Sequence, residues 1–250
     1  MCLIAWNWQP DRKSLLLLAN RDEFYARAAL PLHWWPDGKV LAGQDLQAGG
    51  TWLGVSRSGR LAALTNYRLP VNDTAIKPSR GGLVTGFLQG DMDATDYLGR
   101  LAEQADRYNP FNLLIFDGQL LMGLESRKPR VLTLQAGMGA VSNADFDTPW
   151  PKLVRLKSGL QQQCLEGRTG IPELLPLLQD RSIATDAALP HTGVPLELER
   201  TLSATWIAST TYGTRVSSIV TLEQQQLTFF EQGYAAQGAL QATQQIFTLS

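Results

Sequence analysis

Cysteine and histidine are nearly absent from this chain of 250 residues, which has two of each. The cysteines, Cys2 and Cys164, lie far apart, and His33 and His191 stand alone in segments flanked by Trp or Pro. Such a set assembles no zinc pattern and gives little support to a cysteine–histidine protease pair. Sparse cysteine is typical of a reducing compartment, so we expect a cytoplasmic protein. The alternative use of the two thiols is a Cys2–Cys164 disulfide.

Long hydrophobic runs and a charge excess of one sign are also lacking. The purely apolar stretches are only a few residues long, far short of the ~20 residues that a membrane-spanning helix needs. The N-terminus has no basic segment followed by an apolar one, so we expect no secretory signal. The formal net charge is -1, which argues against nucleic acid as the main partner. We therefore expect neither nucleic acid nor stable insertion in a bilayer.

The chain does have a thiol at its second residue. Methionine aminopeptidases act when the second residue is small, so removal of Met1 would leave Cys2 with a free α-amine beside its thiol. Unperturbed, these groups have pKa values of ~7.7–8.0 and ~8.5, both close to working pH. A nucleophile with its own general base is the arrangement of N-terminal-residue nucleophiles. The alternative is a small apolar residue in a buried first strand.

Runs of strand-like sequence alternate with helical segments. Strands are expected over residues 1–8, 14–19, 40–45, 51–56, 60–66, 112–117, 120–125, 130–134, 206–209, 215–222 and 226–231 and around Phe247. Helices are expected over residues 82–89, 93–108, 149–165 and 172–178, with Asp93 and Asp147 as caps and 71–80 as a loop. Strand runs with segregated helices predict an α+β fold of two packed sheets covered by helices. No linker divides the chain, so residues 1–250 are expected to form one domain.

The first two strands predict a hairpin that brings polar residues to the thiol. A turn about Asp11 pairs residues whose numbers sum to about 22, which puts Cys2 opposite Asn20, give or take two residues. Arg21 and Asp22 then lie beside Cys2. A guanidinium there favours the thiolate, and a carboxylate can hold the α-ammonium. Without the hairpin, residues 20–23 are an ordinary solvated strand end.

Three more polar clusters interrupt apolar strands near their ends, at residues 65–68 (TNYR), 142–144 (SNA) and 212–215 (YGTR). An Asn amide at a strand end can donate to an oxyanion, and a late Arg can anchor an acidic group. Turn residues and surface charges are the alternative interpretation of each cluster.

The segments MCLIAW, NRDE, GGTWLGVSRSGRLAALTNYR, VSNADFDTPWPKL and TYGTRVSSIV occur in this order. Together they resemble the NRDE-motif family, also called the transport and Golgi organisation protein 2 family. The match extends beyond position 220, and NRDE combined with SNADFDTPWPK is specific to the family. The resemblance implies a four-layer αββα sandwich of the N-terminal nucleophile hydrolase type. More distantly, the motifs are similar to those of choloylglycine hydrolase and penicillin V acylase.

This more distant resemblance implies catalytic roles. In that group the N-terminal Cys attacks an amide, helped by an Arg and an Asp at the end of the second strand. Cys2 matches the nucleophile, Asp22 the carboxylate that contacts the α-amine, and Arg21 the arginine, although the spacing between Arg and Asp is shorter here. No metal is expected at the site.

The later segments supply the remaining candidates. Asn66 and Asn143 match positions of oxyanion-hole residues, and Arg215 matches a late arginine of the group. We expect Asn143 and Arg215 to converge on Cys2. The residues expected to contact substrate are Asn20, Tyr67 and Arg68.

The predicted function is hydrolysis of an amide or thioester of a small acyl substrate by an N-terminal cysteine, without a cofactor. The alternative follows from the family's association with haem trafficking and with the handling of lipids and acyl-coenzyme A. It is a non-catalytic carrier of haem or acyl-coenzyme A on the same fold, with Cys2, His33 or His191 as candidate haem ligands. A retained Met1 would block the α-amine and favour the carrier.

Overall fold

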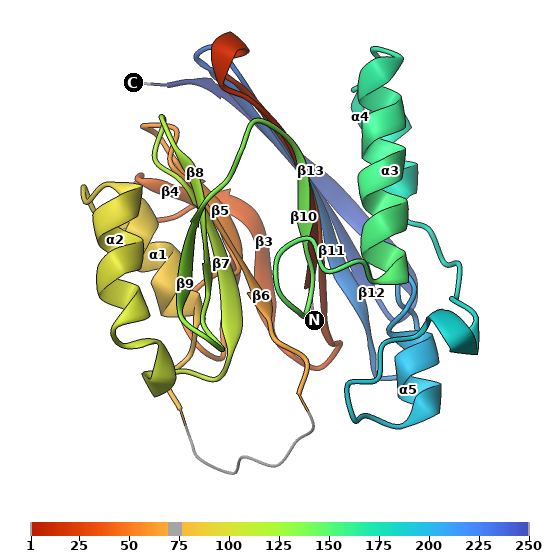
Figure 1. The fold of residues 1–250 in the computed structure, drawn as a ribbon. Coiled ribbons are helices and arrows are strands. Elements are labelled where there is room, and N and C mark those ends of the chain that lie inside the picture. The colour runs from red at the N-terminus through yellow and green to blue at the C-terminus, as the bar shows by residue number, and fades with distance from the viewer. Residues whose placement is uncertain (1, 70–76, 250) are drawn as a thin grey trace.

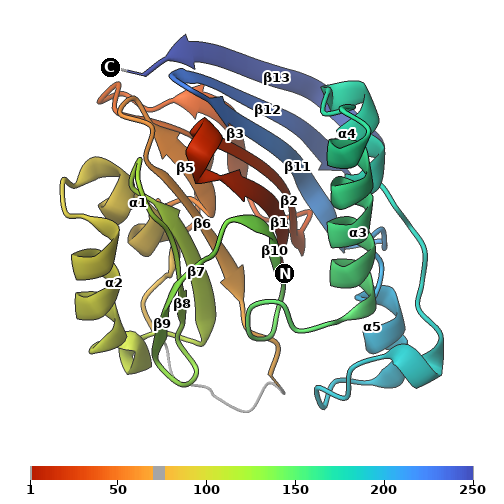
Figure 2. The same ribbon diagram turned by 45° about the horizontal axis from the view of Figure 1, so that its top comes forward.

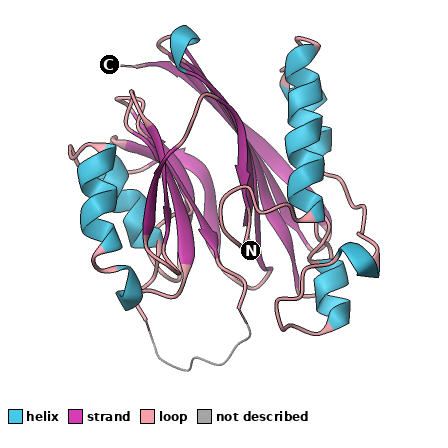
Figure 3. Cartoon of the chain, in the orientation of Figure 1, coloured by secondary structure: helices cyan, strands magenta, loops and turns pink. Residues whose placement is uncertain are grey.

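The computed structural model describes residues 2–69 and 77–249. Thirteen strands in these residues form two antiparallel sheets that stack face to face (Figure 1). Helices cover the outer face of each sheet, as the colouring by secondary structure shows (Figure 3). The chain therefore has the expected four-layer αββα sandwich.

The first sheet has six strands and holds both ends of the described chain (Figure 2). In spatial order they are β10 (Gly137–Val141), β1 (Cys2–Gln9), β2 (Ser14–Phe24), β11 (Tyr212–Glu223), β12 (Gln226–Ala235) and β13 (Gly238–Thr248). The outer face packs against α3 (Pro151–Leu165) and α4 (Ile171–Leu178), and α5 (Leu196–Thr201) lies near one end.

The second sheet has seven strands, adjacent in chain order. They are β3 (Ala29–Trp34), β4 (Val40–Asp45), β5 (Leu53–Ser56), β6 (Leu61–Asn66), β7 (Phe111–Phe116), β8 (Leu121–Glu125) and β9 (Arg130–Thr133). The helices on its outer face are α1 (Gly81–Gln89) and α2 (Ala94–Ala102). None of the helices in the described residues is long and apolar enough to cross a membrane.

Alternate side chains of β1 pack against different layers of the sandwich. Trp6 and Trp8 face the core between the sheets, where the ring of Trp8 lies 5.1 Å from that of Phe116. Leu3 and Ala5 face the other way and pack with residues of α3 and α4. Because both faces of the strand are covered, its sequence is almost continuously apolar.

The β1–β2 hairpin agrees with its prediction. A 3₁₀ turn over Pro10–Arg12 joins the strands, and Lys13 closes it with a left-handed φ of 49°. Cys2 pairs with Arg21 and Leu3 pairs with Asn20, within the expected margin. The pairing puts the thiol and the Arg21 side chain on the same face of the sheet.

Other boundaries differ from the prediction. Asp93 does cap α2, accepting a hydrogen bond from Asp96 N, but the helix ends at Ala102. Asp147 does not cap α3, which begins at Pro151; its Oδ1 accepts from Ala140 N instead. Residues 206–209 form one isolated bridge rather than a strand. Of the expected loop 71–80, residues 71–76 lie outside the described part.

Two strands and one short helix were not predicted. Residues 137–141, for which no strand was expected, form β10, where the indole of Trp6 occupies the space that a side chain on Gly139 would need. Strand β3 was missed because it contains Pro31, which argues against a strand. The proline is tolerated because β3 lies at the edge of its sheet, where a missing backbone N–H costs little. Helix α5 has only six residues, too few for a periodic signal.

Candidate functional site

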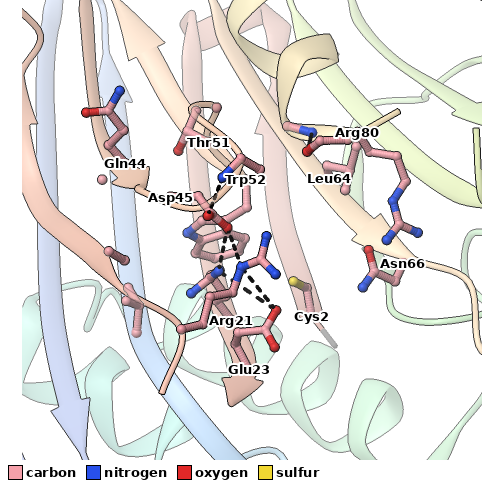
Figure 4. Close-up of a pocket in the computed structure, with 18 of the residues that line it drawn as sticks. Cys2, Arg21, Glu23, Gln44, Asp45, Thr51, Trp52, Leu64, Asn66 and Arg80 are labelled. Atoms are coloured by element: carbon pink, nitrogen blue, oxygen red, sulfur yellow. Dashed lines mark hydrogen bonds and ion pairs between the residues drawn. The ribbon is translucent and has the colours of Figure 1, made fainter. Parts of the chain in front are cut away.

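A pocket opens at the end of β1 where Cys2 lies (Figure 4). Its volume is about 300 Å³, at the small end of ligand pockets, which span roughly 300–1,000 Å³. The wall combines apolar and charged side chains from β2, β4, β6, β12 and the start of α1. Its principal members are Cys2, Arg21, Asp22, Glu23, Arg27, Asp45, Trp52, Leu64, Asn66, Arg80 and Glu231.

The Cys2 thiol is buried. Burial raises the pKa of this thiol and the Asp22 carboxylate adds to the rise, whereas the positive charge of the N-terminus and then Arg21 oppose it. The arginine thus acts in the expected direction, but desolvation is the larger effect. With residue 1 attached, the structure therefore disfavours the thiolate rather than favouring it.

Asp22 follows Arg21 on β2, so its side chain points to the face opposite the Cys2 thiol, although both residues line the pocket. Its Oδ1 accepts a hydrogen bond of 2.7 Å from Thr214 Oγ1 on β11. The same hydroxyl oxygen accepts from Ile207 N, and the Tyr212 hydroxyl donates to the Asp22 carbonyl oxygen. These bonds fix the carboxylate in a buried position at the end of β2, from which its charge raises the pKa of the Cys2 thiol.

Arg21 belongs to a charge network that the sequence did not reveal. Its Nη2 lies 3.3 Å from Asp45 Oδ2, and Arg27 Nε lies 2.6 Å from the same oxygen. Burial acts to raise the pKa of Asp45, but hydrogen bonds from Arg27 and Ala48 outweigh it and hold that pKa below its usual value. Arg21 is therefore compensated by a carboxylate from the other sheet.

The two predicted oxyanion residues meet directly. Asn143 Nδ2 donates to the Asn66 carbonyl oxygen at 2.8 Å, and Asn66 lines the pocket with Cys2. Ser142 Oγ lies 3.2 Å from both the Cys2 carbonyl oxygen and Asn143 Oδ1. Residues 142–143 thus connect the end of β6 to the start of β1.

Lys152 is a buried cation that sequence reasoning missed. Only 1% of it is exposed, and its Nζ donates to Asn143 Oδ1 at 3.4 Å. Burial lowers the pKa of its ammonium to about 8, against the opposing effect of Asp22. A signal was present, because Lys152 precedes the buried Leu156 by one turn and so lies on the apolar stripe of α3.

Asn20 was expected to contact substrate, and the structure corrects this. Its side chain lies on the face of β2 that is covered by helices, away from the pocket. Nδ2 donates to the carbonyl oxygens of Leu178 and Thr205, and Oδ1 accepts from Ser217 Oγ at 2.7 Å. These bonds use its amide to tie α4 and the segment before β11 to the sheet.

Arg215 does not converge on Cys2. The β2–β11 register shifts between Thr214 and Val216, and the guanidinium of Arg215 donates to the carbonyl oxygens of Phe24, Arg27 and Tyr234. It therefore secures the chain after β2, outside the pocket lining.

Tyr67 and Arg68 also lie outside the pocket lining. The Tyr67 hydroxyl donates to Asp145 Oδ1 at 3.0 Å. Arg68 forms a buried ion pair of 2.6 Å with Glu199, and its guanidinium lies 4.6 Å from the centre of the Trp150 ring. Both side chains contact neighbouring segments of the chain, and neither reaches the space where a ligand would lie.

Of the three candidate haem ligands, only one lies at the pocket. Cys2 lines the pocket, whereas His33 and His191 do not. Both cysteines are free. In the described part of the chain, no three His, Cys, Asp or Glu side chains gather in a group that could hold a metal ion.

Sequence and fold comparisons identify similar proteins. The family model for Transport and Golgi organisation 2 matches residues 1–236. The human Transport and Golgi organization protein 2 homolog is 34% identical over 247 residues, with 89% of each chain covered. The mouse homolog is 33% identical over 247 residues, again covering 89% of each chain.

Among solved structures, a mutant of the conjugated bile acid hydrolase from Clostridium perfringens aligns with a TM-score of 0.56. The sequence identity is 11%, and the alignment covers 100% of this chain and 97% of that chain. At this identity the likeness shows the fold alone, which is that of the N-terminal nucleophile hydrolases.

Proposed function

Because this chain belongs to the Transport and Golgi organisation 2 family and has an N-terminal nucleophile hydrolase fold, we propose that it is a cysteine hydrolase. The proposed reaction cleaves an amide or thioester of a small acyl substrate. The observation that carries the proposal is the position of Cys2 in a pocket that Asp22 and Asn66 also line, with the Asp22 carboxylate fixed by Thr214.

The proposed enzyme requires cleavage of the bond between Met1 and Cys2. With that bond intact, residue 2 has an amide in place of the α-amine, and burial keeps the thiol protonated. After cleavage, the α-amine of Cys2 would take the thiol proton, and Asp22 would stabilise the resulting ammonium. A reducing compartment such as the cytoplasm would keep the thiol available.

In the first chemical step the thiolate would attack the substrate carbonyl carbon, and the carbonyl oxygen would become an oxyanion. The Asn66 side-chain amide is the proposed donor to that oxygen, and Asn143 supports Asn66 and has a second amide N–H of its own. Collapse would break the bond to the leaving amine or thiol, which receives the proton from the α-ammonium. Water would then hydrolyse the thioester on Cys2, so that the acid leaves and the thiol is restored.

The dimensions of the pocket favour a small acyl group. A volume of about 300 Å³ suits a short chain against Trp52 and Leu64 better than a bulky ligand. This fit supports the hydrolase over a haem carrier, whose histidine candidates lie outside the pocket.

The test is to incubate protein lacking Met1 with acyl amides and acyl thioesters and to measure the intact mass. We expect an acyl adduct on Cys2 or steady product, lost in Cys2→Ala and retained in the matched cysteine variant Cys164→Ala. Asn66→Ala, which removes the proposed oxyanion donor, should slow the reaction by roughly 10²–10³-fold. Absence of adduct and product, combined with equal binding of haem or acyl-coenzyme A by wild type and Cys2→Ala, would contradict the hydrolase and support the carrier.

A further inference from the structure

Four charged side chains on one wall of the Cys2 pocket compensate one another. Arg27 Nε and Arg21 Nη2 lie 2.6 Å and 3.3 Å from Asp45 Oδ2. Glu23 Oε2 lies 3.9 Å from both arginines. Two cations and two anions therefore balance on this wall, and none of them needs a ligand for compensation.

Arg80 differs from these arginines. It lies just before α1 and beside Asn66, on the other wall of the pocket (Figure 4). Its Nη1 donates to the Pro110 carbonyl oxygen at 3.1 Å, and it has no ion pair with a carboxylate from the described residues. A guanidinium has five N–H donors, so one carbonyl leaves most of them available.

The surroundings of Arg80 make an anion the favourable occupant. Burial lowers the pKa of its guanidinium, while the negative charge of Cys2 and of Glu23 acts to raise it. A partly desolvated cation is unfavourable until an anion approaches, and the planar guanidinium matches a carboxylate through two parallel hydrogen bonds. Arg80 thus presents to the pocket a cation that forms no ion pair with a carboxylate of the described residues.

The position of Arg80 limits where that anion belongs on a substrate. Cys2, Asn66 and Arg80 line the same small pocket, so an anion on Arg80 would be near a carbonyl under attack by Cys2. Leu30, Trp52 and Leu64 supply an apolar surface for the rest of the molecule.

We infer that Arg80 binds a carboxylate of the substrate, located a few bonds from the carbonyl that Cys2 attacks. The inference rests on the proposed function and specifies its substrate class: small acyl amides or thioesters that carry a carboxylate on the acyl side or on the leaving group.

The test measures binding in the Cys2→Ala variant, which lacks the nucleophile, by titration calorimetry. Two matched pairs are compared: N-butanoylglycine with N-butanoylglycinamide, and succinanilic acid with its carboxamide. The first pair carries the charge on the leaving group and the second on the acyl group. For at least one pair, the carboxylate should bind roughly 10- to 100-fold more tightly than the neutral amide.

Substitution of Arg80 identifies the group responsible. Arg80→Gln should bind both members of the preferred pair equally, and Arg80→Lys should keep part of the preference. Arg27→Gln removes the same charge from the compensated wall and should retain the preference. Thermal melting of each variant checks that the fold is kept.

Three results would overturn the inference: no carboxylate binding more tightly than its amide, equal loss of preference in Arg27→Gln and Arg80→Gln, or an unchanged preference in Arg80→Gln. Because binding in Cys2→Ala needs no chemistry, absence of acyl transfer in wild type would refute the hydrolase and leave an Arg80-dependent preference standing. Acyl transfer without that preference would refute Arg80 alone.

Discussion

The Lys152 ammonium lies 3.4 Å from the side-chain oxygen of Asn143, and both groups are enclosed by the fold. Because Asn143 Oδ1 accepts this bond, its Nδ2 is directed to the Asn66 carbonyl oxygen, 2.8 Å away. A buried cation thus sets the orientation of an amide that lies behind the candidate active site.

The first prediction concerns stability against pH. The folded pKa of Lys152 is about 8, below its ordinary 10.5, so between these values the unfolded chain binds a proton that the folded chain releases. The free energy of unfolding should therefore rise with pH across this window, on the order of 3 kcal/mol in total from this group. Below pH 8 both states are protonated, and the full penalty of the buried charge is present.

Urea denaturation at about pH 8 and pH 10 measures this effect. The Lys152→Met variant should not show this rise. The free energy of unfolding of the variant minus that of the parent protein should therefore be larger at about pH 8 than at about pH 10. Both proteins should carry Cys2→Ala, because the thiol also titrates in this range. Identical pH dependence in the two proteins would show that Lys152 keeps an ordinary pKa.

The second prediction concerns the buried pair of Arg68 and Glu199, whose charged atoms are 2.6 Å apart. Arg68→Met would leave a buried carboxylate without its cation, which typically costs about 3–5 kcal/mol. The matched control is Arg200→Met, because Arg200 lies in the same helix as Glu199 but its ion pairs are exposed, and it should change stability little. Equal effects of the two substitutions in urea denaturation would contradict the prediction.

The hairpin could be predicted because its pattern is local. The alternation of side chains along the same two strands could also have predicted which residues face the pocket. Cys2 pairs with Arg21, so these two share a face, whereas Asn20 shares the opposite face with Leu3. Applied strictly, the two-residue period would have placed Asn20, and Asp22 with it, on the face opposite the thiol. The Arg215 expectation failed for another reason, because a bulge turns its side chain and the sequence carries no clear signal for it.

The residues that were missed depend on contacts between distant segments. Asp45 reaches Arg21 across the sheets, and Arg80 reaches the pocket from the start of α1. No spacing rule connects these positions to Cys2, since they meet only once the two sheets have packed. Local pattern thus predicted the strand that carries Cys2, whereas the charges around Cys2 required the tertiary structure.

The third prediction concerns Glu231, which lines the pocket and is buried. Burial raises the pKa of its carboxyl to about 7, although Leu32 N donates to it at 2.7 Å. Between the ordinary 4.5 and 7, the folded chain keeps a proton that the unfolded chain loses. Stability from this group should therefore fall as pH rises through this window, by about 3 kcal/mol in total.

Glu231→Gln keeps an acceptor for Leu32 N and cannot ionise. Its stability relative to wild type should increase between about pH 4.5 and pH 7, measured by urea denaturation in buffers of equal ionic strength. A constant difference over this range would mean that Glu231 ionises in the folded state as it does in water.

The last prediction concerns the reactivity of Cys2 before and after release of Met1. While the bond to Met1 is intact, burial raises the thiol pKa, so the rate of alkylation by iodoacetamide should still rise through about pH 9 without a plateau. Cleavage would place a free α-ammonium on Cys2 itself, and this cation should lower the thiol pKa and speed alkylation near neutral pH. Arg21→Met should slow alkylation in both forms, because Arg21 lowers the same pKa. Mass spectrometry of the N-terminal peptide, in a Cys164→Ala background, follows the reaction. A plateau below pH 8 with Met1 attached would show that the thiol is already activated, and equal rates in the two forms would remove the role assigned to the α-amine.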